Sequence, residues 1–118
     1  EGVYIGPNVK IGNHCKIQNH ALIYEGVEIG DGVFIGPNVI TTNDSLPQAT
    51  GPWRHRFETT LIMNLASVGA NSTILCGITI GEGAMVGAGS VVTQDIRPWW
   101  IAFGNPAHHV RNRNDLPC

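Results

Sequence analysis

The residues best suited to chemistry gather in one short stretch between Pro47 and Leu61. This stretch places an imidazole, two guanidinium groups and two aromatic rings in consecutive positions, as Trp53, Arg54, His55, Arg56 and Phe57. A histidine titrates near neutral pH and can act as a general base, and arginine pairs with anionic groups. We predict that His55 is catalytic and that Arg54 binds substrate. The alternative is a surface loop that the fold tolerates at little cost.

The rest of the chain follows a six-residue repeat that must position these groups. From Ile5 to Ile40 six hexads begin with isoleucine, and they read IGPNVK, IGNHCK, IQNHAL, IYEGVE, IGDGVF and IGPNVI. The fifth residue of each hexad is small or β-branched. Two such positions in every hexad match neither the 3.6-residue period of a helix nor the alternation of a long strand. The pattern predicts short strands joined by corners, which is a β-solenoid.

The fourth residue of each hexad favours a tight corner. In the first run this position holds Asn8, His14, His20, Gly26, Gly32 and Asn38. These residue types tolerate positive φ better than others do. A zinc site at His14 and His20 is an alternative, but their spacing puts them at adjacent corners, so they could share a metal only across a subunit boundary. We predict no metal site.

A second run of hexads extends from Ile62 to Arg97 and reads IMNLAS, VGANST, ILCGIT, IGEGAM, VGAGSV and VTQDIR. Leu65 is the exception to the corner pattern. We predict one domain with a β-helix over 1–97, a loop insertion at 47–61, and a C-terminal turn and irregular tail over 98–118, where the sequence is a poor helix former. Residues Glu1–Tyr4 read as the last four of a hexad, so we expect that a preceding portion of the protein is missing.

Composition excludes several classes of function. The formal net charge is −2, and the basic residues are scattered, so we expect no nucleic-acid partner. No apolar run approaches the length that spans a bilayer, so we expect no membrane partner. The three cysteines, Cys15, Cys76 and Cys118, have neither metal nor disulfide spacing. This favours a reduced, cytoplasmic protein.

Over almost the whole chain these hexads resemble those of the hexapeptide-repeat acyltransferases. The resemblance implies an all-β fold, a left-handed parallel β-helix of triangular section with three hexads to a coil. This chain would then form about four to five coils with one inserted loop. The left hand is an exception to the usual right-handed crossover. The resemblance also implies a homotrimer, and acetyl-coenzyme A (acetyl-CoA) as co-substrate.

A finer resemblance lies in the run IGNHCKIQNHALIYEGVEIGDGVFIGPNVITTND, with Pro47 shortly after it. It is similar to the N-acetyltransferases that act on nucleotide-linked 3-amino sugars for surface polysaccharides. The resemblance implies that Thr42 and Asn43 lie in the active site. We add His20 and Asp44 as candidate substrate-binding residues. An arginine often follows the proline in those relatives, whereas this chain has Gln48, which leaves contacts to an acidic group of the substrate open.

Coenzyme A needs a groove in which small residues expose backbone groups to its pantetheine amides. In the family this groove lies along the later coils, between two subunits. The best matches here are Gly69, Ala70, Gly87 and Ala88, although these residues could equally serve the prism alone. Arg97, Arg111 or Arg113 would bind the phosphates. Trp99 and Trp100 would either flank the adenine or pack over the last coil.

The nature of the acceptor decides which side chain matters most. An amine is partly neutral near pH 7, so positioning and oxyanion stabilisation by Asn43 can do most of the catalysis. A hydroxyl must lose its proton as it attacks, and a base such as His55 is then expected. The resemblance implies an amine acceptor, so we expect acetyl transfer to an amino sugar. The alternatives are an O-acetyltransferase or antibiotic acetyltransferase of the same fold, and a non-catalytic or truncated β-helix protein.

Overall fold

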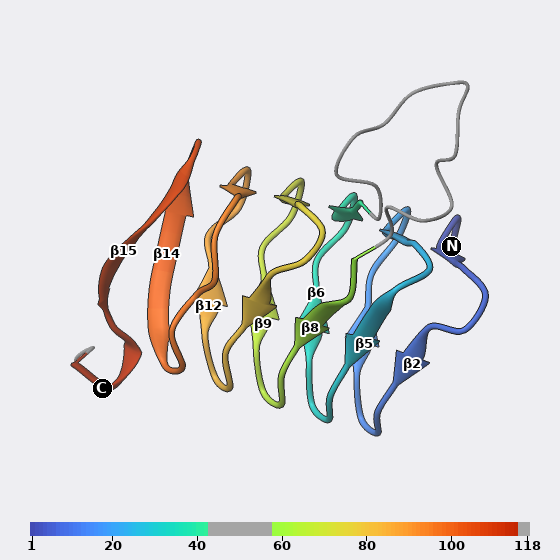
Figure 1. Ribbon diagram of the computed structural model, residues 1–118, viewed down its shortest axis with the longest axis horizontal. Coiled ribbons are helices and arrows are strands. Elements are labelled where there is room, and N and C mark those ends of the chain that lie inside the picture. The colour runs from blue at the N-terminus through green and yellow to red at the C-terminus, as the bar shows by residue number, and fades with distance from the viewer. Residues whose placement is uncertain (43–57, 116–118) are drawn as a thin grey trace.

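The chain forms a solenoid of short parallel strands in this computed structural model, which describes residues 1–42 and 58–115 (Figure 1). The strands build three sheets, here called A, B and C. Sheet A contains β1 (Tyr4–Ile5), β4 (Leu22–Ile23), β7 (Ile40–Thr41), β10 (Thr73–Ile74) and β13 (Val91–Val92). Sheet B contains β2 (Lys10–Ile11), β5 (Val27–Ile29), β8 (Thr60–Ile62) and β11 (Thr79–Ile80). Sheet C contains β3 (Lys16–Ile17), β6 (Phe34–Ile35), β9 (Ser67–Val68), β12 (Met85–Val86), β14 (Trp100–Gly104) and β15 (Ala107–Asn112).

The chain visits sheets A, B and C in turn and then returns to A one coil later. Tyr4 pairs with Leu22, and Leu22 pairs with Ile40, so neighbouring coils are 18 residues apart. Five coils stack in this way, from β1 to β14, with the N-terminus at one end of the stack and the C-terminus at the other (Figure 1). The predicted all-β solenoid of four to five coils is confirmed.

The core is the column of side chains that point into the solenoid, from the first and fifth residues of the hexads. Its largest fully buried members include Ile23, Ile35, Ile62, Ile74 and Ile80. Burying each such side chain stabilises the fold by roughly 1.5–3 kcal/mol. Ile5 occupies an equivalent position but is 46% exposed, because the first coil has a neighbouring coil on one side only. The predicted inward positions are thus confirmed.

The corners form three edges, named here by the sheets that they join. Edge AB has its corners at Asn8, Gly26 and Gly77, edge BC at His14, Gly32, Leu65 and Gly83, and edge CA at His20, Asn38, Asn71 and Gly89. All of these residues have positive φ, as the hexad pattern predicts. The prediction that Leu65 breaks the pattern is wrong, since its φ is +64°. Its N–H donates to the carbonyl of Asp31 at 2.8 Å, so coil-to-coil hydrogen bonding imposes the corner on an unfavourable residue.

The interruption between the two runs of hexads is placed differently from the predicted insertion at 47–61. Ile40 and Thr41 of β7 pair with Thr73 and Ile74 of β10, which are 33 residues away rather than 18. Thr60–Ile62 form β8 and pair in parallel with Val27–Ile29 of β5. Ile62 therefore stacks on Ile29 as the predicted register requires, but the strand begins two residues earlier, at Thr60, and the insertion lies between Thr42 and Glu58. The hexad pattern hides this because threonines occupy both inward positions, Thr41 and Thr60, where aliphatic residues are usual.

The final coil is two residues shorter than the others. Ile80 pairs with Ile96 and Val86 with Ala102, and both pairs are 16 residues apart. Val92 still pairs with Ile74 on sheet A, but Ile96 follows it after four residues instead of six. The corner on edge AB that was predicted at Asp95 is therefore absent, and Trp99 holds the next positive-φ corner (φ +66°), on edge BC. The carboxylate of Asp95 instead accepts the N–H of Thr79 at 2.8 Å.

The C-terminal region corrects the prediction of a turn and irregular tail over 98–118, because two strands, Trp100–Gly104 and Ala107–Asn112, form there. β14 continues sheet C in parallel with β12, and β15 turns back antiparallel to β14 (Figure 1). A short 3-10 helix, η2 (Arg113–Asp115), follows. Ala102 is fully buried, so this hairpin closes the last coil of the core.

Candidate active site

Thr42 lies on edge AB, directly after β7, where the regular coil is interrupted. Its Oγ1 accepts the backbone N–H of Cys76, one coil further along, at 3.1 Å. Beside it, Oγ1 of the buried Thr60 accepts the N–H of Gly77 at 3.1 Å. These hydrogen bonds join the coil that carries the insertion to the next coil. Thr42 is half-exposed, so the base of the insertion is both fixed and open to a ligand.

Glu58 follows the insertion and lies against the same corner. Its carboxylate accepts a hydrogen bond from the thiol of Cys76, with 3.8 Å between Sγ and Oε2. Burial, with a further contribution from the negative charge of Glu58, raises the pKa of the Cys76 thiol. The thiol therefore stays protonated at neutral pH and remains a donor to Glu58. A side chain on Gly77 would lie 2.9 Å from the carboxylate, so glycine leaves the space that Glu58 fills.

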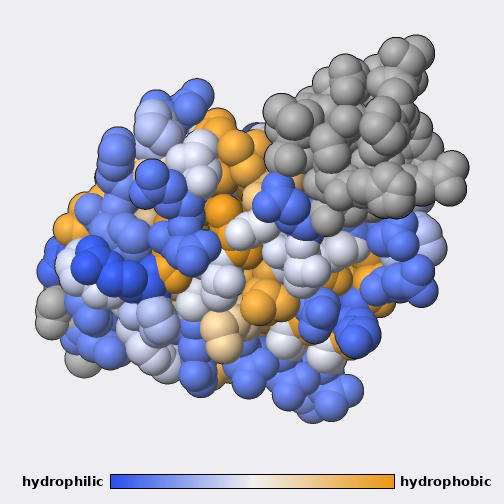
Figure 2. Space-filling view, viewed as in Figure 1, coloured by the Kyte–Doolittle hydropathy of each residue, from blue (hydrophilic) through white to orange (hydrophobic). Residues whose placement is uncertain are grey.

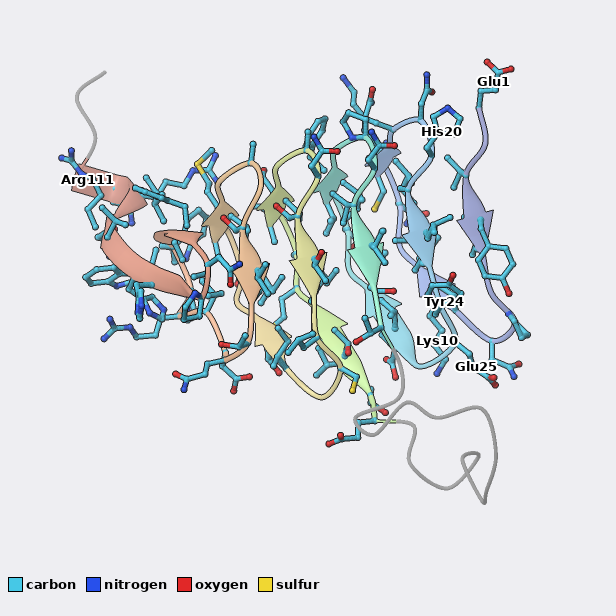
Figure 3. All side chains as sticks on the ribbon, turned by 90° about the horizontal axis from the view of Figure 1, so that it is seen from above. Glu1, Lys10, His20, Tyr24, Glu25 and Arg111 are labelled. Carbon is cyan, nitrogen blue, oxygen red and sulfur yellow. The ribbon has the colours of Figure 1, made fainter. Side chains whose placement is uncertain are left out.

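Tyr24 and Glu25 lie on the coil before Thr42 and complete the surroundings of this corner. The N–H of Tyr24 donates to Oγ1 of Thr41 at 3.0 Å, and its ring packs against Tyr4 with the ring centroids 5.3 Å apart. The amide of Asn8 donates to Oε2 of Glu25 at 3.1 Å. Figure 3 shows Tyr24 and Glu25 together at one edge of the solenoid, with Lys10 close by. The sequence analysis missed these residues, although the 18-residue period places Tyr24 directly beside Thr42.

The other predicted residues on the acceptor side divide into two groups. His20 lies on edge CA, so sheet A separates it from Thr42 within one chain. Its imidazole lies over Gly2, where a side chain would collide with the ring. Asn43, Asp44, Arg54 and His55 fall outside the described residues, and their roles stay predictions.

The four small residues predicted to line the coenzyme A groove lie on edge CA, just after the strands of sheet C. A side chain on Gly69 would come within 2.6 Å of the backbone N of Ala88, and one on Gly87 within 2.7 Å of Phe103. Close coil-to-coil packing therefore requires both glycines, whatever else they do. Ala88 is exposed and Ala70 is half-exposed. The groove stays a prediction that this packing neither requires nor excludes.

Arg97 and Arg111 lie near the opposite end of the sheet C strands, towards edge BC. The guanidinium of Arg97 lies 4.4 Å from the centre of the Trp100 ring, and Arg111 pairs with Ile101 across the hairpin. Figure 3 shows Arg111 at the C-terminal end of the stack. One chain therefore does not bring these arginines together with Gly69 and Gly87. The predicted coenzyme A residues occupy two separate edges.

His109 is held neutral by its contacts in this hairpin. Its Nε2 accepts the backbone N–H of Arg97 at 3.0 Å, and its ring lies edge-on to Trp100. Burial, and then the positive charge of Arg97, lower the pKa of His109 below its usual value. The unfolded chain therefore binds this proton more readily than the folded one. The stability that results is present above the usual histidine pKa and is lost as the pH falls below it.

We accordingly expect the melting temperature to decrease as the pH is lowered from about 7.5 to about 5.5, the range in which an ordinary histidine gains its proton. The variant His109→Gln should show a shallower fall, because it removes the titrating group. The matched control is His108→Gln, which changes the exposed neighbour on the same strand and should keep the wild-type slope. Equal slopes in all three proteins, measured by thermal denaturation across the pH series, would contradict this account of the hairpin.

Within residues 1–42 and 58–115, no helix is long and apolar enough to cross a membrane. The same ranges contain no group of three or more histidine, cysteine, aspartate or glutamate side chains that could hold a metal ion. His14 and His20 lie on different edges, BC and CA, as their spacing predicts.

Comparison with known proteins shows which protein family this chain belongs to. A family model described as Bacterial transferase hexapeptide (six repeats) matches residues 8–43 and 59–94. The gap between the matched ranges coincides with the interruption between β7 and β8. The chain belongs to the bacterial transferase hexapeptide family, and its fold is the left-handed parallel β-helix.

Individual proteins that this chain is similar to are acetyltransferases. The dTDP-3-amino-3,6-dideoxy-alpha-D-galactopyranose 3-N-acetyltransferase of Aneurinibacillus thermoaerophilus is 59% identical over 51 residues, which cover 43% of this chain and 27% of that protein. A chloramphenicol acetyltransferase of Agrobacterium fabrum is 43% identical over 56 residues, which cover 48% of this chain and 27% of that protein. A galactoside acetyltransferase solved in complex with coenzyme A superposes with a TM-score of 0.82 at 28% identity, over 97% of this chain and 66% of that one. The matches thus span about a quarter of these two curated relatives.

Proposed function

We propose that this protein transfers an acetyl group from acetyl-CoA to the amino group of a nucleotide-linked sugar. The observation that carries this proposal is the 59% identity, over 51 residues, with an enzyme named for N-acetylation of a dTDP-linked 3-amino sugar. The structure of a galactoside acetyltransferase with coenzyme A supports the choice of donor. Surface polysaccharide synthesis in the cytoplasm is the setting that we propose.

The proposed reaction makes modest demands on the protein. The neutral amine attacks the thioester carbonyl, an amide bond forms, the carbon–sulfur bond breaks, and coenzyme A leaves as a thiol after gaining a proton. Holding the amine against the carbonyl and stabilising the oxyanion supply most of the rate enhancement. The Thr42 corner would hold the acceptor. The small residues on edge CA would hold the donor.

The test is an acceptor screen that follows release of the coenzyme A thiol and the mass of the product. We expect turnover with dTDP-3-amino-3,6-dideoxygalactose and little with galactosides or chloramphenicol. Turnover of a galactoside without the amino sugar would favour an O-acetyltransferase, and turnover of chloramphenicol would favour the antibiotic alternative, which the Agrobacterium relative supports. Failure of coenzyme A to bind at all would favour a non-catalytic β-helix protein.

We also propose that the active unit is a homotrimer. In one chain, sheet A separates Thr42 on edge AB from Gly69 and Gly87 on edge CA. In a closed three-fold ring with sheet A facing the axis, edge AB of one copy lies beside edge CA of the next. The outward row of sheet A suits such a contact because it carries no charge: Tyr4, Leu22, Ile40, Thr73 and Val91. The equivalent rows include Lys10 and Glu28 on sheet B and Lys16 on sheet C.

A pair of matched substitutions tests the trimer. Ile40 on sheet A is 38% exposed and Leu61 on sheet B, in the same coil, is 37% exposed. Ile40→Lys places an ammonium group inside the proposed contact, where charge is disfavoured, and should yield monomers. Leu61→Lys should leave the trimer intact. Sedimentation at micromolar concentration measures the outcome, and a monomeric wild type or equal behaviour of the two variants would refute this assembly.

Apolar side chains are not confined to sheet A, which makes the control necessary. Figure 2 shows apolar side chains exposed among polar ones on the face in view. Met63 and Leu65 are 45% and 49% exposed, and neither lies on sheet A. Exposed hydrophobic residues alone therefore do not identify the subunit contact, whereas the absence of charge across five coils does distinguish sheet A.

A further inference from the structure

Glu25 is a half-buried carboxylate that one hydrogen bond orients. Asn8 holds its Oε2 at 3.1 Å, and this amide hydrogen bond fixes the side chain without cancelling its charge. Among residues 1–42 and 58–115, no lysine, arginine or histidine pairs with Glu25. Lys10 lies in the same region (Figure 3), and its cross-strand neighbour is Glu28. A fixed anion of this kind is suited to a cationic group of a ligand.

The surroundings of Glu25 belong to the Thr42 corner. Tyr24, the preceding residue, donates its N–H to Thr41 at 3.0 Å and is half-exposed beside Thr42. On the other side, Gly26 lies against the insertion coil, because a side chain there would come within 3.3 Å of the carbonyl oxygen of Glu58. The ring of Tyr24 and the carboxylate of Glu25 lie one coil before Thr42, against Tyr4 and Asn8 of the first coil. Because neighbouring coils are about 4.8 Å apart, a ligand at Thr42 that extends over one coil spacing would reach both groups.

We propose that Glu25 binds the ammonium form of the acceptor's amino group and that the ring of Tyr24 packs against the acceptor sugar. This inference rests on the proposed function. The contact selects an amino sugar over its hydroxyl counterpart, because only the amine carries a positive charge to pair with the carboxylate. Glu25 is therefore a specificity-determining residue, and the neutral amine that attacks the thioester forms after the proton is lost.

Glu28 provides a matched control on the same coil. It lies on β5 of sheet B, where its cross-strand neighbour is Lys10, and it is exposed. Glu25→Gln and Glu28→Gln remove the same charge from the same coil and keep the side-chain shape. A general effect of net charge would appear in both variants, whereas pairing with the acceptor would appear in Glu25→Gln alone.

The test measures binding by calorimetry, without acetyl-CoA, of dTDP-3-amino-3,6-dideoxygalactose and of dTDP-6-deoxygalactose, its 3-hydroxyl counterpart. Wild type and Glu28→Gln should prefer the amino sugar, and Glu25→Gln should bind it about tenfold more weakly, the scale of one charge-assisted hydrogen bond. Binding of the hydroxyl sugar should change little. The preference should fade in the wild type as the pH rises and the amine loses its charge, and Glu25→Asp should restore part of it.

The outcomes separate this inference from the function on which it rests. If the wild-type protein acetylates the amino sugar while Glu25→Gln keeps the full preference, the role of Glu25 is refuted and the function stands. Equal losses in Glu25→Gln and Glu28→Gln would refute it in the same way. If the wild type acetylates only hydroxyl acceptors, the proposed function fails and the inference fails with it. Matching melting temperatures of the two glutamine variants confirm that binding, and not folding, is compared.

Discussion

Replacing Gly83 with alanine is expected to lower the free energy of unfolding by about 3 kcal/mol or more. Gly83 holds a φ of +67°, which costs an L-residue roughly 1–2 kcal/mol. A Cβ there would also collide with the indole of Trp99, whose Cδ2 would be 2.6 Å away. Overpacking of this kind adds about 1–3 kcal/mol. Urea denaturation of the two proteins measures the difference.

Gly89→Ala is the matched control, because it isolates the backbone cost. Gly89 has a similar φ of +72°, but a Cβ there would meet no atom within 4 Å. We expect a loss of only about 1–2 kcal/mol. Gly83 also accepts a hydrogen bond from Nη1 of Arg113 at 2.9 Å, so displacement of Trp99 would disturb the C-terminal segment as well. Equal losses in the two variants would show that Trp99 does not pack on Gly83 as described.

Replacing Asn43 with alanine is expected to lower the turnover rate by about 10² or more, the scale of losing one oxyanion or positioning contact. The reason is chemical: if the acceptor is an amine, the main task is to hold its nitrogen against the thioester carbonyl. His55→Ala should then cost about tenfold or less, because a strong base is optional. Steady-state kinetics with the amino sugar and acetyl-CoA compares the two variants.

A larger loss of turnover in His55→Ala than in Asn43→Ala would refute the amino-sugar proposal. A hydroxyl acceptor needs its proton removed during attack, and losing the general base then forfeits about 10² to 10⁴. An inactive His55→Ala variant beside an active Asn43→Ala variant would therefore favour an O-acetyltransferase. Both residues lie between the described ranges, so this comparison is also the most direct evidence on how the insertion takes part in the reaction.

The repeat could be predicted from sequence because each of its rules acts locally. An aliphatic residue at the first hexad position and a glycine or asparagine at the fourth each state what the backbone must do there, namely face inward or turn with positive φ. Gly26, Gly32 and Asn38 follow these rules and are placed correctly. Leu65 does not, and the prediction failed there because hydrogen bonds from the neighbouring coil, and not its own preference, set its φ.

The ends of the regular repeat could not be predicted for a related reason. Thr60 looks like part of the loop by residue type, yet it is fully buried because its hydroxyl accepts the N–H of Gly77. Near the C-terminus, the repeat that begins at Val92 is two residues short, and the residue types alone do not reveal where the next lead position falls. The pairing of Ile96 with Ile80 decides it. The hairpin of β14 and β15 likewise forms because it has sheet C to extend.

The sequence by itself determined the period, the inward positions, most of the corners and the presence of one insertion, since these depend on interactions within a hexad. It also pointed to Thr42. Only the tertiary structure decided what surrounds Thr42, because Tyr24, Glu58 and Cys76 reach that corner from other coils through hydrogen bonds and packing between residues distant in the chain. It also showed that the predicted coenzyme A residues occupy separate edges, because the triangular section separates side chains that follow one another closely in sequence.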